Sequence, residues 1–249
     1  MSGHSKWSSI KRKKGAKDEK RGRLFAKLLR GIEGAAREGG PSVEANMTLA
    51  SAVEKARSYS VPVDTIERAI KRGAGEAGGA RYEEVTYEGY GPAGVAILVE
   101  ALTDNRNRTG QEVRHTFTRL GGNLGDPGSV AWMFRRRGLI SIDKAVAPDE
   151  ERLLEITVEA GADDLTDTGE QWEIITEPES LRDVRTALDD AGIQAAAAET
   201  TMLPATGVPV GHDKAEAVLR LIEALEDLED VQAVYSNFDI PEEVLTQTG

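Results

Sequence analysis

The feature that most limits how this chain can fold is a glycine-rich run at residues 73–80 (GAGEAGGA), where the spacing of apolar residues changes. Before it, apolar residues recur every three or four positions, which is typical of amphipathic helices. After it, short runs of β-branched residues indicate strands. Because glycine-rich segments favour linkers and turns, we expect a helical domain to end here and a strand-containing domain to follow.

The helical domain is expected to span residues 24–80. Its first helix begins at Leu24, because Leu28 and Ile32 follow at steps of four residues and so share one face. A Gly-Gly-Pro sequence at 39–41 ends it, since glycine and proline there cannot continue a helix.

Two further helices complete the predicted helical domain, over about residues 47–59 and 64–73. The third begins at Asp64, because Asp64 and Glu67 have the spacing of a capping box in which Asp replaces Ser or Thr. One side of this helix is apolar and the other is basic, with Arg68, Lys71 and Arg72. A basic face is found on DNA-reading helices and equally on helices that face water, and the sequence leaves both interpretations open.

The residues after the glycine-rich run are predicted to form a β-hairpin. Two β-branched runs flank a Gly-Tyr-Gly-Pro-Ala-Gly turn. Gly89, Gly91 and Gly94 satisfy the dinucleotide-binding spacing, but that motif must open a helix and the following VAILVEAL is strand-like, so we reject it. The two predicted strands of the hairpin lie at residues 84–90 and 94–102. A helix at 109–120, a turn at 121–125 and a further strand at 130–134 are predicted to follow.

Residues 137–204 are predicted to form a complete unit with the element order βαββαβ of a ferredoxin-like fold. Residues 81–136 supply strands and a helix before it, and residues 205–249 supply a final helix and strand. Because a lone helix and strand cannot bury their apolar faces, we expect these two pieces to join as one discontinuous domain. The predicted fold class is multi-domain α+β: a small N-terminal helical domain, then two ferredoxin-like α/β sandwiches, the third domain inserted in the second. Four independent pieces are the alternative.

Charge is unevenly distributed along the chain, whose formal net charge is −12. Residues 1–81 carry eighteen basic and nine acidic side chains, whereas residues 140–249, which include most of the predicted inserted domain, carry six and twenty-seven. An anionic partner should therefore be attracted to the amino-terminal part and repelled by the carboxyl-terminal part.

A basic arm at residues 1–23 is the first candidate nucleic-acid site, and we expect it to be flexible because it has too few apolar residues to offset the entropy of ordering. Lysine and arginine neutralise phosphates, and one tryptophan ring offers a surface for stacking on a base. A solvated tail is the alternative. The candidate residues are Lys6, Trp7, Lys11, Arg12, Lys13, Lys14, Lys17, Lys20, Arg21 and Arg23, together with Arg68, Lys71 and Arg72 of the third helix.

A second polar candidate site surrounds the start of the helix predicted at 109–120. Guanidinium and amide groups can grip a phosphate or a base edge. The alternative is that these side chains satisfy backbone groups of a loop, with Asp104 or Asn107 as the helix cap. The candidate residues are Asn105, Arg106, Asn107, Arg108, Arg114 and His115. Farther on, three arginines at 135–137 mark either the crossing between two domains or a solvated charge run.

Several function classes lack support in the sequence. The chain has no cysteine, its three histidines are far apart, and no Walker A, Gly-x-Ser-x-Gly or His-Glu-x-x-His motif occurs, so we expect no metal, no cofactor and no enzyme activity. No run approaches the about 20 apolar residues that a membrane helix needs, and the basic amino terminus lacks the apolar segment of a secretory signal. We therefore expect a cytoplasmic protein without a membrane partner.

Five separated motifs resemble those of the YebC/PmpR family, which includes the mitochondrial translational activator of cytochrome c oxidase. They are the Gly-His-Ser-Lys-Trp at 3–7, the basic arm, and the motifs at 87–92, 104–109 and 121–125. The resemblance implies a helical first domain, two α/β domains with the third inserted in the second, a cytoplasmic location and a role in gene expression through nucleic acid. Residues 206–211 (TGVPVG) differ from the polar linker expected there.

Two nucleic-acid functions remain open after the sequence is considered. The resemblance implies either a DNA-binding transcriptional regulator or a ribosome-associated translation factor that contacts ribosomal RNA through the same basic arm. A Lys/Arg arm supplies affinity for the phosphate backbone but no base code, so we expect shallow sequence discrimination. The acidic third domain suits an RNA–protein surface better than an extended duplex. A role outside nucleic-acid binding, as an enzyme or a protein scaffold, is the third possibility.

Overall fold

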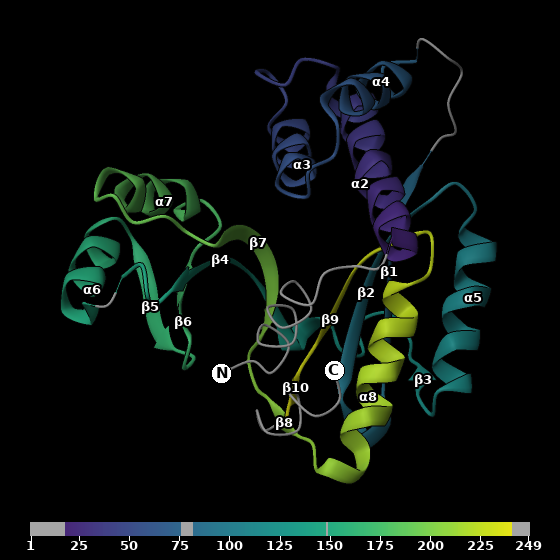
Figure 1. Cartoon of the computed structure of the whole chain (residues 1–249). Coiled ribbons are helices and arrows are strands. Elements are labelled where there is room, and N and C mark those ends of the chain that lie inside the picture. The colour runs from purple at the N-terminus through teal and green to yellow at the C-terminus, as the bar shows by residue number, and fades with distance from the viewer. Residues whose placement is uncertain (1–17, 76–81, 148, 241–249) are drawn as a thin grey trace.

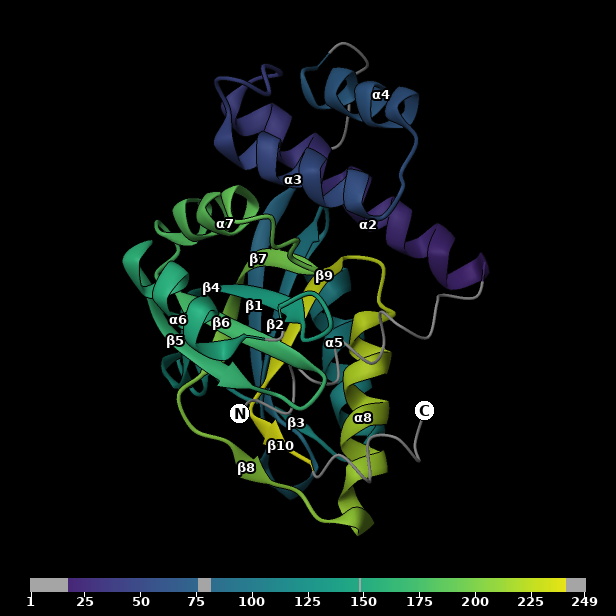
Figure 2. The same cartoon turned by 60° about the vertical axis from the view of Figure 1, so that its left-hand side comes forward.

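The computed structural model describes residues 18–75, 82–147 and 149–240, with side chains from residue 22 onward. It is a mixed helix-and-sheet protein with two four-stranded antiparallel sheets and a helical amino-terminal region, which confirms the predicted class at that level. In Figures 1 and 2 the amino-terminal helices lie at one end, above a central sheet, and the green segment of the chain forms a separate unit beside it.

The helical region contains α2, α3 and α4, which span Asp18–Gly39, Met47–Ser58 and Val63–Gly73. Their shared core includes Leu28 and Ile32, which were predicted to share one face of the first helix, together with Leu49 and Ile66 of the other two helices. The end of α4 packs closely on α2, since a Cβ atom at Gly73 would lie only 2.4 Å from the Glu33 carbonyl oxygen. A side chain at residue 73 would therefore separate the two helices.

Two predicted helix starts in the helical region are wrong. The first helix begins at Asp18 rather than Leu24, so residues 18–23 of the predicted flexible arm are helical. Lysine, arginine and glutamate are good helix formers and extend the packed helix without needing a core of their own. The third helix begins at Val63, after Pro62, and Asp64 lies within its first turn without capping it, so the predicted capping box is absent. An acidic residue there still interacts favourably with the helix dipole.

The central sheet has the strand order β3-β1-β2-β9. Its strands β1, β2, β3 and β9 span Glu83–Tyr90, Ala96–Thr103, Asn123–Leu124 and Val231–Ser236. The predicted hairpin is confirmed: β1 and β2 pair antiparallel around the short 3₁₀ turn Pro92–Gly94, and a strand rather than a helix follows the glycines. Strand β9, from the carboxyl-terminal part, pairs with β2 and completes the sheet.

Helices α5 (Arg106–Arg119) and α8 (His212–Glu226) cover one face of the central sheet. Val113 and Phe117 of α5 and the apolar side of α8 form one buried cluster with the inward residues of β2 and β9. Two short strands, β8 (Val208–Pro209) and β10 (Phe238–Asp239), pair parallel beside it. The final helix and strand thus bury their apolar sides against residues encoded more than a hundred positions earlier.

The opposite face of the central sheet is covered by the start of β4 (Phe134–Asp143). The predicted strand at 130–134 is wrong, because residues 131–133 form a 3₁₀ turn and β4 begins only at Phe134. The backbone N–H groups of Val130 and Ala131 bond to the Glu88 carboxylate instead of to a neighbouring strand. The three arginines at 135–137 lie within β4, between a cluster that contains Phe134 and one that contains Ile140.

The inserted unit is a sheet with the order β5-β6-β4-β7 and two helices. Its remaining elements β5, α6, β6, α7 and β7 span Ala162–Asp167, Glu150–Glu159, Gln171–Thr176, Leu181–Asp190 and Ala197–Pro204. All three strand pairs are antiparallel. Strands β4 and β7 pair continuously from Phe134–Pro204 to Ser141–Ala197, so the predicted boundary between residues 136 and 137 falls inside a paired strand.

Candidate nucleic-acid interface

The predicted basic arm is only partly described. Lys6, Trp7, Lys11, Arg12, Lys13, Lys14 and Lys17 lie outside the described residues. Lys20 and Arg21 lie on α2, of which only the backbone is described there. Arg23 is exposed, and its guanidinium lies 3.9 Å from the Asp227 carboxylate. The candidate face at this end is therefore described only from residue 22 onward.

The basic side of α4 is used partly within the helical region. Arg72 lies 2.5 Å from the Glu33 carboxylate of α2, so it joins two helices. The Arg68 guanidinium donates to the Asp64 carbonyl and the Thr65 hydroxyl of its own helix. Lys71 is exposed and forms no hydrogen bond or ion pair with any residue that the structure describes. The three side chains are thus neighbours on α4, but Arg68 and Arg72 already have partners within the protein, whereas Lys71 has none among the described residues.

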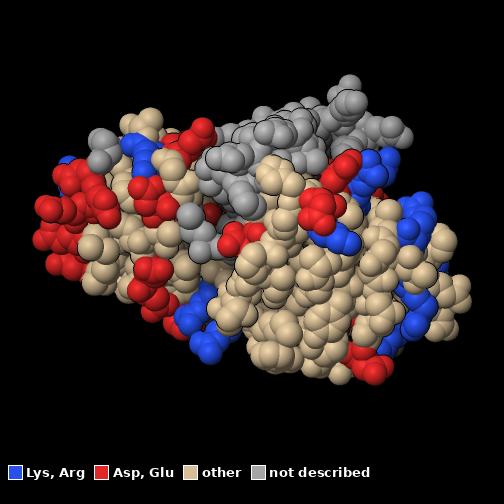
Figure 3. Space-filling model, turned by 90° about the horizontal axis from the view of Figure 1, so that it is seen from below, with Lys and Arg blue, Asp and Glu red and all other residues tan. Residues whose placement is uncertain are grey.

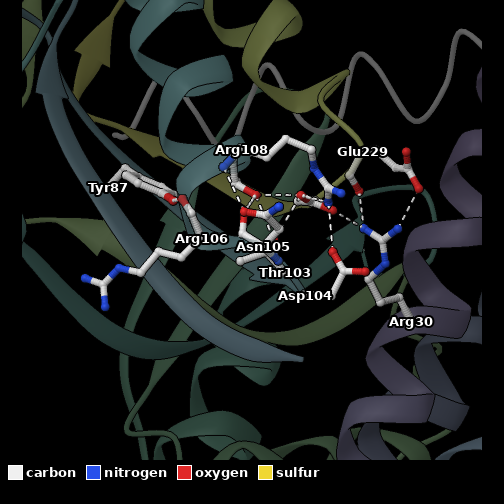
Figure 4. A network of polar contacts seen from close by, with 10 residues as sticks. Arg30, Tyr87, Thr103, Asp104, Asn105, Arg106, Arg108 and Glu229 are labelled. Carbon is white, nitrogen blue, oxygen red and sulfur yellow. Dashed lines mark hydrogen bonds and ion pairs between the residues drawn. The ribbon is translucent and has the colours of Figure 1, made fainter. Parts of the chain in front are cut away.

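The second candidate site forms the start of α5 (Figure 4). The Asn105 side chain accepts a hydrogen bond of 3.1 Å from the Arg108 backbone N–H, so Asn105 is the helix cap. The prediction that Asp104 or Asn107 caps the helix is wrong, as is a start at Thr109. Asp104 instead forms an ion pair with Arg108 at 3.0 Å. Asn105 and Arg108 therefore have structural partners within the protein.

A buried carboxylate that the sequence did not indicate organises this loop. Asp230, between α8 and β9, is only 1% exposed. One of its oxygens accepts hydrogen bonds from Arg108 at 2.7 Å, Thr109 at 2.6 Å and Thr103 at 3.1 Å. The other accepts from Arg30 of α2 at 2.7 Å. No local pattern could reveal this group, because its partners lie far away in the sequence.

The charge of Asp230 is stabilised by these contacts. Burial alone would raise the pKa of the carboxyl, but the hydrogen bonds from Arg108, Thr109 and Thr103 and the charge of Arg108 outweigh burial, so its pKa lies below the ordinary value. The site consequently holds a carboxylate anion that binds two guanidinium groups at neutral pH.

Helix α2 is fastened to the turn between α8 and β9 by several cations. Arg30 lies 2.6 Å from the Glu229 carboxylate (Figure 4). Its guanidinium also lies 5.5 Å from the centre of the Tyr82 ring. Lys27 donates to the Glu226 carbonyl. These basic side chains therefore neutralise an acidic turn of the same chain.

A different set of cations is exposed and unpaired. Their side chains form no hydrogen bond or ion pair with any residue in the described part of the chain, and they lie on α5 and at the start of β4. The set, which we call the free cations, consists of Arg106, Arg114, Arg119, Arg135 and Arg136, and the exposed side chain of His115 lies on α5 with them. Arg106, Arg114 and His115 belong to the predicted second site, whereas Arg119, Arg135 and Arg136 were not among the candidate residues.

The surface charge is polarised in space. Figure 3 shows acidic side chains gathered over the inserted unit at one end, and Lys and Arg along the opposite edge, where α5 lies in Figure 1. Among the described helices, none is long and apolar enough to cross a membrane. The described residues also contain no group of three or more side chains suited to hold a metal ion.

Comparison with known proteins places the chain in a family. Residues 5–76 match the TACO1/YebC protein N-terminal domain, and residues 82–238 match the TACO1/YebC second and third domain. The chain belongs to the TACO1/YebC family. The resemblance found in its motifs is thereby confirmed over nearly the whole length.

Relatives of this TACO1/YebC chain are similar over their full lengths. A probable transcriptional regulatory protein of Acidothermus cellulolyticus is 54% identical over 99% of this chain and 100% of its own. One of Mycolicibacterium gilvum is 55% identical over 99% and 98%. The crystal structure of a conserved hypothetical protein, Aq1575 from Aquifex aeolicus, matches with a TM-score of 0.81 at 48% identity and covers 92% of this chain and 94% of that one.

Proposed function

We propose that this protein regulates gene expression by binding nucleic acid, as a cytoplasmic DNA-binding transcriptional regulator rather than an enzyme. The observation that carries the proposal is the set of free cations on α5 and β4 in a chain whose net charge is −12. Carboxylates are abundant, yet these guanidinium groups bind none of those described. They remain available for phosphates, which bind arginine in a bidentate manner.

The direction of the α5 side chains supports a contact with base edges as well as with phosphates. Asn107, Gln111 and Arg114 lie along one exposed line of the helix, on a different side from the buried Val113 and Phe117. Amide side chains pair with adenine and arginine with guanine in the major groove. The relatives named above as probable transcriptional regulatory proteins agree with this function.

The acidic inserted unit favours a second candidate function. Its acidic surface would repel an extended duplex that ran past α5 (Figure 3). A folded RNA–protein surface contains basic proteins, which would attract the acidic unit, as well as phosphates for the free cations. A ribosome-associated factor that contacts ribosomal RNA through the same cations is therefore the alternative.

Crosslinking in cells, followed by sequencing of the bound nucleic acid, separates the two functions. Enrichment of promoter DNA is the result expected for the transcriptional regulator, and enrichment of ribosomal RNA would favour the alternative. A variant that lacks the free cations gives the background level. If neither promoter DNA nor ribosomal RNA were recovered above that level, both functions would be contradicted.

We also infer that the inserted unit is a ferredoxin-like sandwich and an independent domain whose paired strands begin at Phe134 and end at Pro204. The support is its element order βαββαβ, its antiparallel order β5-β6-β4-β7 and its own buried cluster around Ile140, Leu153 and Leu188. In the proposed function this acidic domain limits which nucleic acids can approach the free cations.

A further inference from the structure

Trp132 is the most exposed aromatic group in the part of the chain that the structure describes. Its side chain is 72% exposed, although tryptophan is ordinarily well buried. It lies on the 3₁₀ turn Ala131–Met133, between the buried Val130 and Phe134. An exposed ring flanked by buried residues is held at the surface by its own neighbours.

The turn beneath Trp132 is rigidly built around the carboxylate of Glu88. This buried group accepts backbone hydrogen bonds from Gly128 at 2.6 Å and from Val130 and Ala131 at 2.7 Å each. Burial alone would raise the pKa of Glu88, but these three hydrogen bonds outweigh burial and hold its pKa below the ordinary value. The turn is therefore fixed by a charged group that stays ionised at neutral pH.

The loop that precedes the turn is packed with little room. A Cβ atom at Gly125 would lie 2.6 Å from the Ser129 hydroxyl oxygen, and Gly128 has a φ of 86°. The Tyr90 hydroxyl donates to the Ser129 carbonyl at 3.0 Å. A ring presented by such a loop loses little conformational entropy when a ligand binds.

The polar edge of the Trp132 ring is already satisfied. Its indole N–H donates to the Ser129 carbonyl at 3.2 Å, so the ring offers a partner only its apolar faces. Arg135 and Arg136 follow on the same chain segment and belong to the free cations. The two arginines point to opposite faces of β4, because successive residues of a strand alternate. An aromatic face and unpaired arginines on one chain segment are together suited to a base and its phosphates.

A protein partner fits this surface less well. Aromatic residues that anchor protein interfaces are normally surrounded by further apolar contact area. The other large apolar side chains that are exposed among the described residues are Val43, Met47 and Val63 of the helical region and Val146, Leu154 and Val158 of the inserted unit. None belongs to the central sheet or to the turn that carries Trp132.

We propose that Trp132 is a stacking platform for an unpaired nucleobase, whose flanking phosphates bind Arg135 and Arg136. This inference rests on the proposed function, since it assigns a site for single-stranded nucleic acid to the same protein. Stacking on an aromatic ring tolerates any base, because every base has a π-face.

The test compares Trp132→Ala and Trp132→Phe in the full chain, with a short single-stranded oligonucleotide and an abasic strand that has the same number of phosphates. Trp132→Ala should weaken binding to the oligonucleotide about 5- to 100-fold and leave binding to the abasic strand unchanged. Trp132→Phe should restore most of the affinity. Arg135→Gln should instead weaken binding to both strands. It should also lower the slope of log K against log salt by about 0.7, because one phosphate is no longer neutralised.

Thermal unfolding of Trp132→Ala should match that of the unchanged protein, because the ring is exposed. If the protein bound the oligonucleotide and Trp132→Ala bound it equally well, the stacking platform would be wrong and the proposed function would stand. If the unchanged protein bound neither strand nor a duplex, the proposed function would be wrong, and the platform with it.

Discussion

At the scale of single residues, Asp230 connects parts of the chain that are far apart. Its carboxylate binds Arg30, two hundred positions earlier on α2, and Arg108 and Thr109 at the start of α5. An anion this well buried is tolerated because two guanidinium groups and two hydroxyls satisfy it. Arg108, a candidate ligand-binding residue in the sequence, therefore has a structural role in positioning α5.

Replacing this carboxylate should destabilise the fold. We expect Asp230→Asn to lower the free energy of unfolding by about 3 kcal/mol at neutral pH, since it leaves Arg30 without its buried counter-charge. Denaturant titration measures the change. Asp227→Asn is the matched control, because Asp227 is more exposed and its cation Arg23 lies 3.9 Å away. A decrease no larger than that of the control would contradict the assigned role.

The pKa of Asp230 gives this effect a definite pH dependence. Because the folded protein lowers that pKa, the carboxylate contributes stability above its ordinary pKa of 3.8 and loses that contribution as the pH falls through the folded value. The difference in unfolding free energy between the unchanged protein and Asp230→Asn should therefore shrink below about pH 4. Urea titrations over a pH series measure it, and a difference that widened in acid would contradict the shift.

The assignment of the α5 cap can be tested at one atom pair. Asn105→Ala should lower the free energy of unfolding by about 1 kcal/mol, because the Arg108 N–H loses its acceptor. Asn107→Ala is the control, since Asn107 is exposed and does not cap the helix. Equal decreases for the two variants in thermal or denaturant unfolding would overturn the assignment.

At the scale of helices and strands, apolar periodicity predicted where the elements lie better than where they begin. The inward positions Leu28 and Ile32 of α2 were identified because they repeat with the helix turn. The start of α5 was not, because Asp104, Asn105 and Asn107 are all suitable caps and only the folded loop selects one. The strand predicted at 130–134 failed for a similar reason, since Glu88 captures its N–H groups from outside the segment.

Helix α5 also carries the prediction for ligand binding at this scale. Replacing Arg114 and Arg119 together by Gln should weaken nucleic-acid binding and lower the slope of log K against log salt by about 0.9 per phosphate contact on a duplex. Replacing Arg152 and Arg182 of the inserted unit removes the same charge and should change the slope little. Fluorescence anisotropy across a salt series measures both, and equal effects would rule out a specific role for α5.

At the scale of the whole molecule, the sequence predicts how charge is distributed along the chain. It also predicts that the carboxyl-terminal helix and strand pack against the segment before the inserted unit. The last helix and strand have apolar faces that need a partner, and α8 and β9 find it on β2 and α5. The attachment of α2 to the turn at 226–230 was not readable, because Lys27 and Arg30 follow directly on a basic amino-terminal segment. Separating cations that bind inside the fold from those that remain free requires the tertiary structure.

The central claim is that cations of this acidic protein bind phosphates, and the salt dependence of binding tests it most directly. The full chain should be compared with a variant in which the free cations Arg106, Arg114, Arg119, Arg135 and Arg136 are all replaced by Gln. We predict that the variant binds nucleic acid more weakly. The slope of log K against log salt should be smaller by up to about 0.7–0.9 for each phosphate that the variant no longer neutralises. An unchanged slope would contradict the account.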